Sequence, residues 1–325
     1  MNNQEYLVAV QCMTYNQSQY IVDALNGIVM QETSFPFVVL VVDDASTDGE
    51  QDVIRRYVYE QCETGNKEIA YEKETDYAHI AYAQHSTNCN CYIATIYLKE
   101  NHYSQRKSKA AYLAEWRDHV KYIAICEGDD YWIDPQKLQR QVDFMETHPD
   151  YSTSTENGTI YFTKDHNTTL FSNEPTRDIS FEDLLIRRRF PTASVVYRGA
   201  FRVEINKLHP PIFDTLMWAR LSQLGKIHYN DIISSVYRRG CGITESDKIR
   251  WAYTVNSFNR SINKNFIVPK YIKKIRQKDV IENIDVALHE SFRKKRYKDL
   301  AKLLIIGFSI RPKHYIKLIL RKIKF

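Results

Sequence analysis

The chain has 325 residues and a mass of 38.3 kDa, which suits one large domain with an appendage, or two domains. Hydrophobic residues make up 43% and charged residues 26% of the sequence, which excludes a wholly disordered chain, collagen and a coiled coil. The net charge of +5 is uneven, because residues 264–325 hold 18 Lys and Arg against 5 Asp and Glu, while the rest of the chain holds 27 against 35.

The first part of the chain alternates short apolar runs with helical segments. Residues 7–12 predict a strand, and residues 18–31 predict a helix with a serine cap. The continuous β-branched run 37–42 predicts a strand that is buried on both faces. A helix to about residue 62 follows, and residues 69–71 predict a third strand. This alternation implies right-handed crossovers and a parallel sheet.

The rest of the chain is less regular. Residues 77–116 are rich in Tyr, His and Ala and show no clean period. Residues 122–126 predict another buried strand, and a helix follows from Pro135 to about Thr147. The elements expected after it are strand 151–162, helix 181–187, strand 193–197, helix 213–224, strand 227–237 and mainly helix from about residue 246. We therefore expect an α/β domain over residues 1–245 and a basic helical extension over residues 246–325.

Acidic clusters follow two of the predicted buried strands. Asp43 and Asp44 follow the second strand, and Glu127, Asp129 and Asp130 follow the strand that ends at residue 126. Ligands of an open parallel sheet bind beyond the carboxyl ends of its strands. Crowded carboxylates repel one another unless a cation or hydrogen-bond donors offset their charge, and a divalent ion that holds a diphosphate does so. The alternative is a purely structural role, in which these residues only form turns and cap helices.

Several other classes of protein are disfavoured by what the sequence lacks. No Gly-rich loop follows the first strand, which argues against dinucleotide enzymes and P-loop NTPases. Residues 1–5 are polar, and the longest largely apolar stretch, residues 303–310, is much shorter than the roughly 20 residues of a membrane span. The pair Cys89 and Cys91 lacks the second pair that a zinc site would need. We expect reduced thiols and a cytoplasmic protein.

Several segments together resemble the family 2 glycosyltransferases, which have the GT-A fold. Residues 8–16, 41–48 and 122–132 occur in the order and spacing of that family. Residues 134–144 follow the pattern of members that build bacterial surface polysaccharides. The resemblance covers roughly residues 5–240. It implies a GT-A nucleotide-diphospho-sugar transferase fold, and inverting, Mn²⁺- or Mg²⁺-dependent transfer of a hexosyl group from a UDP-sugar to a lipid-linked saccharide or a polysaccharide, in synthesis of the capsule or O-antigen type.

The same resemblance implies residues that bind the nucleotide. Thr14 and Tyr15 would lie in the loop under the nucleotide. Asp44, with Asp43 beside it, is similar to the carboxylate that hydrogen-bonds the uracil or its ribose. Members often close the domain with a histidine in a Tyr-Arg-x-His-x-Gly run, but residues 237–242 lack it. Arg238, or the arginine after it, would hold the diphosphate instead, because guanidinium suits phosphate geometry.

The acidic loop and a later helix complete the implied site. Glu127 stands at the first position of the family's D-x-D motif, with Asp129 as the expected metal ligand. Asp130 would support that ligand or touch the sugar, and Trp132 would either wall the donor sugar or belong to the core. Asp214 occupies the position of the catalytic base, which takes the proton of the acceptor hydroxyl, and it can also cap the helix that follows.

The end of the basic extension predicts an amphipathic helix. Its basic face has Lys313, Lys317, Arg321 and Lys324, and its apolar stripe has Ile316, Ile319, Leu320 and Ile323. This pattern favours an anionic membrane surface as partner, and hence a peripheral position on the inner face of a bacterial plasma membrane. Docking on the body of the protein is the alternative. We expect no nucleic-acid partner, because no nucleic-acid-binding motif accompanies the charge.

Two other functions remain open at this point. A nucleotidyltransferase would have a related fold, but residues 13–17 lack the Gly- and basic-rich signature of such enzymes. A catalytically degenerate binding or scaffold protein at the membrane is motivated by the missing histidine and by the unmatched residues 77–92. Metal-dependent hydrolysis or transfer of a nucleotide sugar would separate an enzyme from a scaffold.

Overall fold

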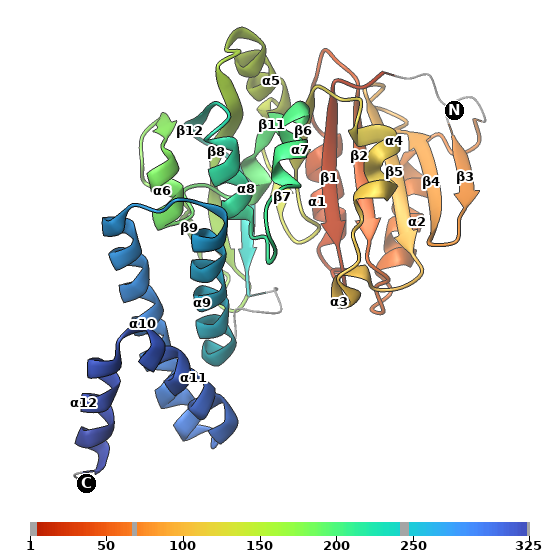
Figure 1. The fold of residues 1–325 in the computed structure, drawn as a ribbon. Coiled ribbons are helices and arrows are strands. Elements are labelled where there is room, and N and C mark those ends of the chain that lie inside the picture. The colour runs from red at the N-terminus through yellow and green to blue at the C-terminus, as the bar shows by residue number, and fades with distance from the viewer. Residues whose placement is uncertain (1–4, 67–69, 241–246, 324–325) are drawn as a thin grey trace. The chain divides into compact units, whose positions relative to one another are not determined.

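The computed structural model describes residues 5–66, 70–240 and 247–323, with side chains described to Leu318. The chain forms two compact units (Figure 1). The first comprises residues up to 180, 189–206 and 220–239, and the second comprises 181–188, 207–219 and 240–325. The second unit therefore contains the C-terminal part of the chain together with two earlier segments. The expected boundary after residue 245 stays a prediction.

The first unit is built on one mixed sheet. Its strands lie in the order β10-β12-β8-β11-β6-β1-β2-β5-β4-β3, with β7 paired to β12 and β9 to β8 (Figure 1). The central strands β6, β1, β2 and β5 are mutually parallel, which agrees with the parallel sheet predicted from the sequence. The strands are β1 Val8–Thr14, β2 Phe37–Asp43, β3 Tyr71–Glu74, β4 Ala78–Gln84, β5 Cys91–Leu98, β6 Tyr122–Ile125, β7 Tyr131–Trp132, β8 Tyr151–Phe162, β9 Thr168–Leu170, β10 Arg177–Ile179, β11 Val196–Arg198 and β12 Lys226–Arg239.

The core of this unit lies between the sheet and helices α1, α2 and α5. All residues of β2 are buried, because it lies at the centre with neighbours on both edges. The helices contribute Leu25 of α1, Ile54 of α2 and Leu138 of α5, each fully buried in the same core as the strands. Each such side chain contributes about 1.5–3 kcal/mol of transfer free energy. The helices of this unit are α1 Ile21–Val29, α2 Glu50–Gln61, α3 His102–Gln105, α4 Ala110–Arg117, α5 Lys137–Thr147 and α7 Arg202–Ile205.

The third parallel strand differs from the prediction. Residues 69–71 were expected to supply it, but β5 is the strand that pairs with β2 in parallel. Residues from Tyr71 on form β3, which pairs antiparallel with β4 at the edge of the sheet. β5 is buried at every position, so the buried strand lies within the stretch whose period was unclear. Strand 193–197 is also shorter than expected, because a 3₁₀ turn, Thr192–Ser194, precedes β11.

The second unit is helical. Its core joins α9, α10, α11 and α12, through Ile249, Ile284, Leu303 and Tyr315 among others. Its helices are α6 Phe181–Ile186, α9 Lys248–Asn265, α10 Lys270–Arg293, α11 Tyr297–Ile310 and α12 Pro312–Ile323, and α8 Asp214–Leu221 spans the boundary with the first unit. Among the described residues, no helix has both the length and the apolar character that crossing a membrane would require.

Helix α12 packs through a face that its apolar stripe does not include. Tyr315 is fully buried, and a Cβ at Gly307 of α11 would overlap its ring, so glycine permits this close approach. Leu318 packs against the same core, whereas Ile316 of the stripe is 49% exposed. The helix therefore docks and still leaves Ile316 accessible to solvent. The side chains of residues 319–323 and all of Lys324 lie outside what the structure describes.

Candidate active site

The predicted site residues meet at one edge of the sheet because the strands that carry them are parallel neighbours. Thr14, the last residue of β1, lies opposite Asp43, the last residue of β2. The amide of Asp44 donates to the carbonyl of Thr14 at 3.1 Å, and the amide of Gly128 donates to Met13 at 3.0 Å. The loops after β1, β2 and β6 are thus tied together at the carboxyl ends of the strands, where an open parallel sheet binds ligands.

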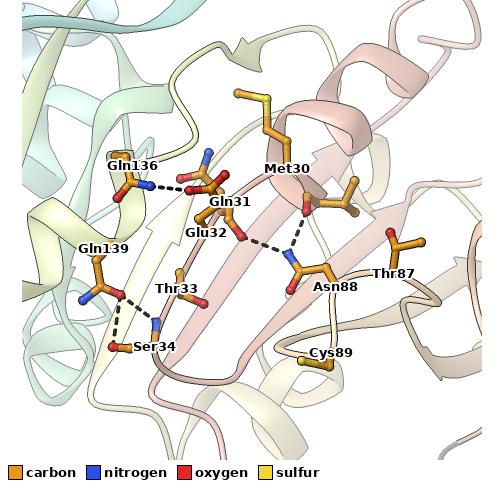
Figure 2. Close-up of a pocket in the computed structure, with 11 residues that line it drawn as sticks. Met30, Gln31, Glu32, Thr33, Ser34, Thr87, Asn88, Cys89, Gln136 and Gln139 are labelled. Atoms are coloured by element: carbon orange, nitrogen blue, oxygen red, sulfur yellow. Dashed lines mark hydrogen bonds between the residues drawn. The ribbon is translucent and has the colours of Figure 1, made fainter.

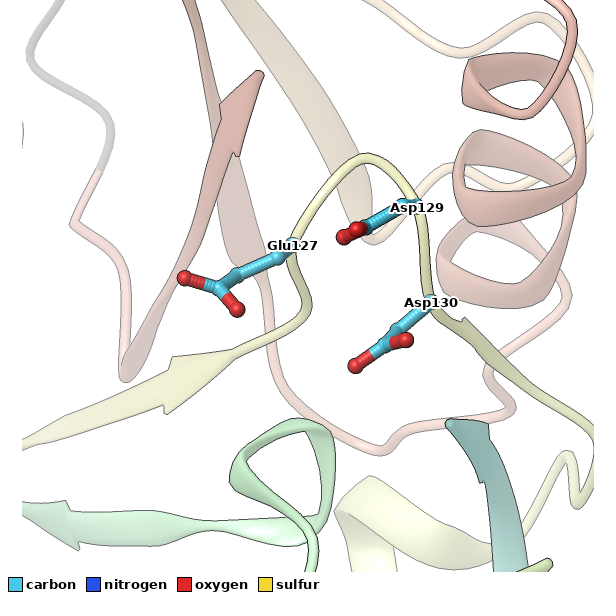
Figure 3. Close-up of side chains that lie close together, drawn as sticks. All are labelled: Glu127, Asp129 and Asp130. Carbon is cyan, nitrogen blue, oxygen red and sulfur yellow. The ribbon is translucent and has the colours of Figure 1, made fainter. Parts of the chain in front are cut away.

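The loop after β6 brings three carboxylates together. Glu127, Asp129 and Asp130 each offer an oxygen, and these oxygens lie within 4.8 Å of one another (Figure 3). Asp130 is buried, while Glu127 and Asp129 are half-buried. Carboxylates this close repel one another, and hard divalent cations such as Mg²⁺ and Mn²⁺ take carboxylate oxygens as ligands. The donor set therefore fits a divalent cation that has further coordination positions for a phosphate-containing ligand.

Arg238 of β12 braces this loop. Its amide donates to Asp130 Oδ1 at 2.9 Å, and its Nη1 donates to the carbonyl of Asp129 at 3.0 Å. Nη2 pairs with Asp23 of α1, and the guanidinium lies 4.9 and 4.4 Å from the ring centroids of Tyr20 and Tyr131. The side chain is 8% exposed. These contacts position both aspartates from one side of the loop.

A buried carboxylate that the sequence analysis missed joins the loops after β1 and β2. Glu50, the first residue of α2, is fully buried and accepts the hydroxyl of Thr14. It also accepts the amide of Gln17 at 2.9 Å and the hydroxyl of Ser46 at 2.8 Å. Burial raises the pKa of Glu50, and the hydrogen bonds from Thr14 and Gln17 oppose that rise. Its only sequence signal was an acidic residue at the start of a predicted helix.

Asn16 adds a second link between the same two loops. Its backbone has a positive φ of 54°, which asparagine tolerates better than most residues. Its amide donates to Ser46 Oγ at 2.8 Å, and its side-chain oxygen accepts the amide of Thr47 at 2.8 Å. Tyr15, between Thr14 and Asn16, is half-buried at the centre of this linked segment.

The two aspartates after β2 have different surroundings. Asp44 accepts the amides of His102 and Tyr103 at 2.8 and 3.0 Å and pairs with Lys109 at 2.9 Å. Asp43 Oδ2 accepts Gln51 Nε2 at 2.5 Å, whereas its Oδ1 is buried without a hydrogen-bond partner among the residues that the structure describes. A buried acceptor without a donor is costly, and no residue that the structure describes supplies a donor to Asp43 Oδ1.

A surface pocket at the opposite ends of the strands has a different character. It has a volume of about 660 Å³ and lies between the segment after α1 and the loop before β5 (Figure 2). Asn88 Nδ2 donates to the carbonyls of Val29 and Gln31 at 2.8 and 2.9 Å, and Gln136 Nε2 donates to Glu32 at 2.5 Å. The polar side chains named here already have hydrogen-bond partners in the protein, and the residues that line the pocket include no carboxylate cluster. The pocket is therefore not the candidate site.

Trp132 belongs to the core, which was one of the two alternatives for it. It is 1% exposed, and its Nε1 donates to the carbonyl of Ala193 at 2.6 Å. Lys137 of α5 is also fully buried, with its Nζ 4.3 Å from the centroid of the Trp132 ring and 2.6 Å from Gln141 Oε1. Trp132 and Lys137 therefore pack against each other inside the protein.

The buried Lys137 predicts a distinct pH dependence of stability. Burial lowers its pKa to about 8 from the ordinary 10.5, so between those values the unfolded chain binds more protons than the folded chain. The free energy of unfolding attributable to Lys137 should thus rise with pH over this window, by about 3 kcal/mol in total. Urea unfolding of the natural protein and of Lys137→Met, measured from pH 7 to 11, should give a difference that changes by this amount. Parallel curves for the two proteins would contradict the prediction.

Asp214 lies at the first position of α8 and is half-buried. It belongs to the second compact unit, whereas the acidic loop and both strand-end aspartates belong to the first. Residues 241 and 242, the end of the run 237–242 that lacks the family's histidine, lie outside the described residues. The structure thus brings together Thr14, Tyr15, Asp43, Asp44, Glu127, Asp129, Asp130 and Arg238 within the first unit.

Comparison with known proteins relates the chain to glycosyltransferases. Residues 12–76 match the sequence model of the glycosyl transferase family 2. An uncharacterized protein of Mycobacterium tuberculosis is 29% identical over 233 residues, which are 71% of this chain and 58% of that protein. TuaG of Bacillus subtilis, whose name assigns it to teichuronic acid biosynthesis, is 28% identical over 146 residues, 45% of this chain and 44% of that protein. The chain thus matches little more than half the length of the mycobacterial relative.

Solved structures show the same fold at low sequence identity. The crystal structure of S. aureus TarS has a TM-score of 0.54 and 13% identity, and the match covers 95% of this chain and 82% of that chain. A mannosyltransferase from Pyrobaculum calidifontis, in complex with GDP-Man and Mn²⁺, has a TM-score of 0.52 and 14% identity, with 99% and 81% covered. TarS has also been solved in complex with UDP. These similarities show the mixed α/β fold with its central, mostly parallel sheet.

Proposed function

We propose that the chain, of which residues 12–76 match glycosyl transferase family 2, is an inverting, metal-dependent glycosyltransferase of the GT-A fold. The donor would be a UDP-sugar, and the acceptor a lipid-linked saccharide or a polysaccharide of a bacterial surface glycan. The observation that carries this proposal is the trio Glu127, Asp129 and Asp130 at the carboxyl edge of a parallel sheet. The mannosyltransferase that shares the fold binds GDP-Man and Mn²⁺, which supports the metal and leaves guanosine as the alternative nucleotide.

Asp129, with Glu127 and Asp130 beside it, would hold the divalent ion. When bound, such an ion supplies positive charge to the diphosphate that departs from the sugar. Arg238 holds the loop through the Asp129 carbonyl and the Asp130 carboxylate, and it would add positive charge on the diphosphate side. Thr14 and Tyr15 would lie under the nucleotide. Asp43 and Asp44 would face its base or ribose, and Asp43 Oδ1 would accept a hydrogen bond that no described residue supplies.

Asp214 would act on the acceptor. In a transfer with inversion, one carboxylate takes the proton of the acceptor hydroxyl while the hydroxyl oxygen forms its bond to the anomeric carbon. The bond from that carbon to the diphosphate oxygen breaks on the opposite side, and the electron pair leaves with the nucleoside diphosphate. The name of the TuaG relative assigns it to teichuronic acid biosynthesis, which supports a role in surface-glycan synthesis for this chain. The acceptor would be presented at an anionic membrane surface, which the basic face of α12 would contact.

The close packing of Gly128 against Thr14 and Gln17 makes the candidate metal site sensitive to substitution at this position. A Cβ at this position would lie 2.6 Å from Gln17 Oε1 and 2.7 Å from Thr14 Cβ, and would also meet the Thr14 hydroxyl. Gly128→Ala should therefore displace the acidic loop and weaken Mn²⁺ binding about 10- to 100-fold. Titration with Mn²⁺ would measure the change, with Gly65→Ala as the control, because a Cβ at Gly65 meets nothing within 4 Å. Equal affinities of the two variants would contradict it.

A metal-dependent donor screen tests the function as a whole. Purified protein would be titrated with UDP-, GDP- and dTDP-sugars in Mn²⁺, in Mg²⁺ and in chelator, and slow hydrolysis would be followed in parallel. We expect one UDP-sugar to bind at least about 10-fold more tightly with metal than with chelator, because the carboxylates repel a bare diphosphate. A folded protein that binds no donor under any condition would instead favour a scaffold on a transferase-like body.

A further inference from the structure

The turn between α9 and α10 exposes apolar side chains that a folded protein ordinarily buries. Ile267 is 97% exposed, although its neighbours Phe266 and Val268 are buried. Tyr271 and Ile275, which are 54% and 44% exposed, follow at intervals of four residues and share one face of α10. Ile267, Tyr271 and Ile275 are called the apolar row below. All three belong to the second unit.

The segment that carries the apolar row is basic. Residues 263–278 contain six Lys and Arg and no Asp or Glu. Two of the six already have acidic partners, because Arg276, which is 5% exposed, pairs with Asp279, and Lys278 pairs with Glu282. The other four are exposed and form no ion pair with any residue that the structure describes: Lys264, Lys270, Lys273 and Lys274.

Three of these lysines stand where a positive charge does not stabilise the helix. The first turns of a helix carry the positive end of its dipole, so cations stabilise the opposite end. Lys270, Lys273 and Lys274 occupy the first five positions of α10, and no acidic residue stands in its first turn. A negatively charged partner would offset both the lysine charges and the helix dipole.

We infer that the α9–α10 turn is a docking surface for an anionic lipid bilayer, with the apolar row in the interface and the four lysines at the headgroups. Lysine suits this position, since its aliphatic stem lies along apolar surface while its ammonium reaches a phosphate. A second copy of the chain fits less well, because a symmetric dimer would place the lysines of one patch against those of the other. The inference rests on the proposed function only for the membrane location of the acceptor. It assigns membrane contact to a surface other than α12.

Vesicle binding by the full-length chain tests the surface. Co-sedimentation would compare vesicles of phosphatidylcholine alone with vesicles that contain about 30% phosphatidylglycerol. We expect binding to the mixed vesicles, and a loss of about 100-fold when Lys270, Lys273 and Lys274 are all changed to Gln, since each charge near the surface is worth about fivefold. The combined variant Ile267→Ser, Tyr271→Ser, Ile275→Ser should lose about 10-fold or more.

A control variant makes the same kinds of change on α11. Ile305 is 70% exposed, and Ile305→Ser with Lys298→Gln and Lys302→Gln should leave vesicle binding within about twofold of the natural protein. Vesicle binding that survives in both the glutamine variant and the serine variant would overturn the inference. Self-association of the natural protein that the serine variant abolishes would also overturn it, because the apolar row would then contact a second copy of the chain. Donor binding measured without vesicles should be the same in all variants, so a failure of docking is distinguishable from a failure of the proposed function.

Discussion

Replacing Asp129 by asparagine is expected to lower the rate of sugar transfer about 1,000-fold. The substitution keeps the size of the side chain and removes one negative charge from a site whose oxygens lie within 4.8 Å of one another. A divalent ion would then lose a charged ligand, and with it several kcal/mol of stabilisation for the departing diphosphate. Donor binding should also lose its dependence on metal, which calorimetry with Mn²⁺ and with chelator would measure.

The matched control for this prediction is Asp52→Asn. Asp52 lies on α2 and is exposed, so the same chemical change there should leave both transfer and metal-dependent binding within about twofold of the natural protein. Asp129→Asn should unfold at nearly the same temperature as the natural protein, because relief of carboxylate repulsion offsets lost contacts. Full activity of Asp129→Asn would show that the acidic loop is not the metal site, and the proposed function would lose its main support.

The centre of the fold could be predicted because its strands carry their own signal. β1, β2 and β6 are short apolar runs followed at once by polar residues, and burial on both faces makes such runs continuous. β5 has the same character, yet it was missed because the preceding residues mix Tyr, His and Ala without a period. β3 is mostly exposed at the edge of the sheet, so no alternation of apolar and polar residues marks its true pairing.

The candidate site also has a part that the sequence predicts and a part that it does not. The acidic residues could be predicted because a strand end fixes where the next side chains stand. Their supports could not, because each depends on a partner far away in sequence. Glu50 becomes a buried acceptor only where the loop of Thr14 meets that of Ser46, and Arg238 contacts Asp23, 215 residues earlier. Trp132 likewise donates to the carbonyl of Ala193, 61 residues later in the chain.

Asp214→Asn is expected to lower the rate of transfer about 100- to 10,000-fold while donor binding stays unchanged. A carboxylate that takes the acceptor proton contributes an effect of this size, and an amide cannot accept that proton. Asp214 is the first residue of α8, and loss of its charge there costs only about 0.3–1 kcal/mol, so α8 should keep its first turn. Single-turnover transfer to an acceptor, together with calorimetry of the donor, would separate a loss in the chemical step from a loss of binding.

The stability of the variants separates a base from a residue that only supports the helix. If Asp214 takes the proton, Asp214→Asn should lose far more transfer activity than its small loss of stability explains. Asp214 lies in the first turn of α8, where its charge favours the helix, so Asp214→Ala and Asp214→Asn should each lower the free energy of unfolding by about 0.3–1 kcal/mol. Hydrolysis of the donor by water, which needs no acceptor proton transfer, provides the internal control. Near-normal transfer by Asp214→Asn would place the base on another residue and leave the assignment of the metal site intact.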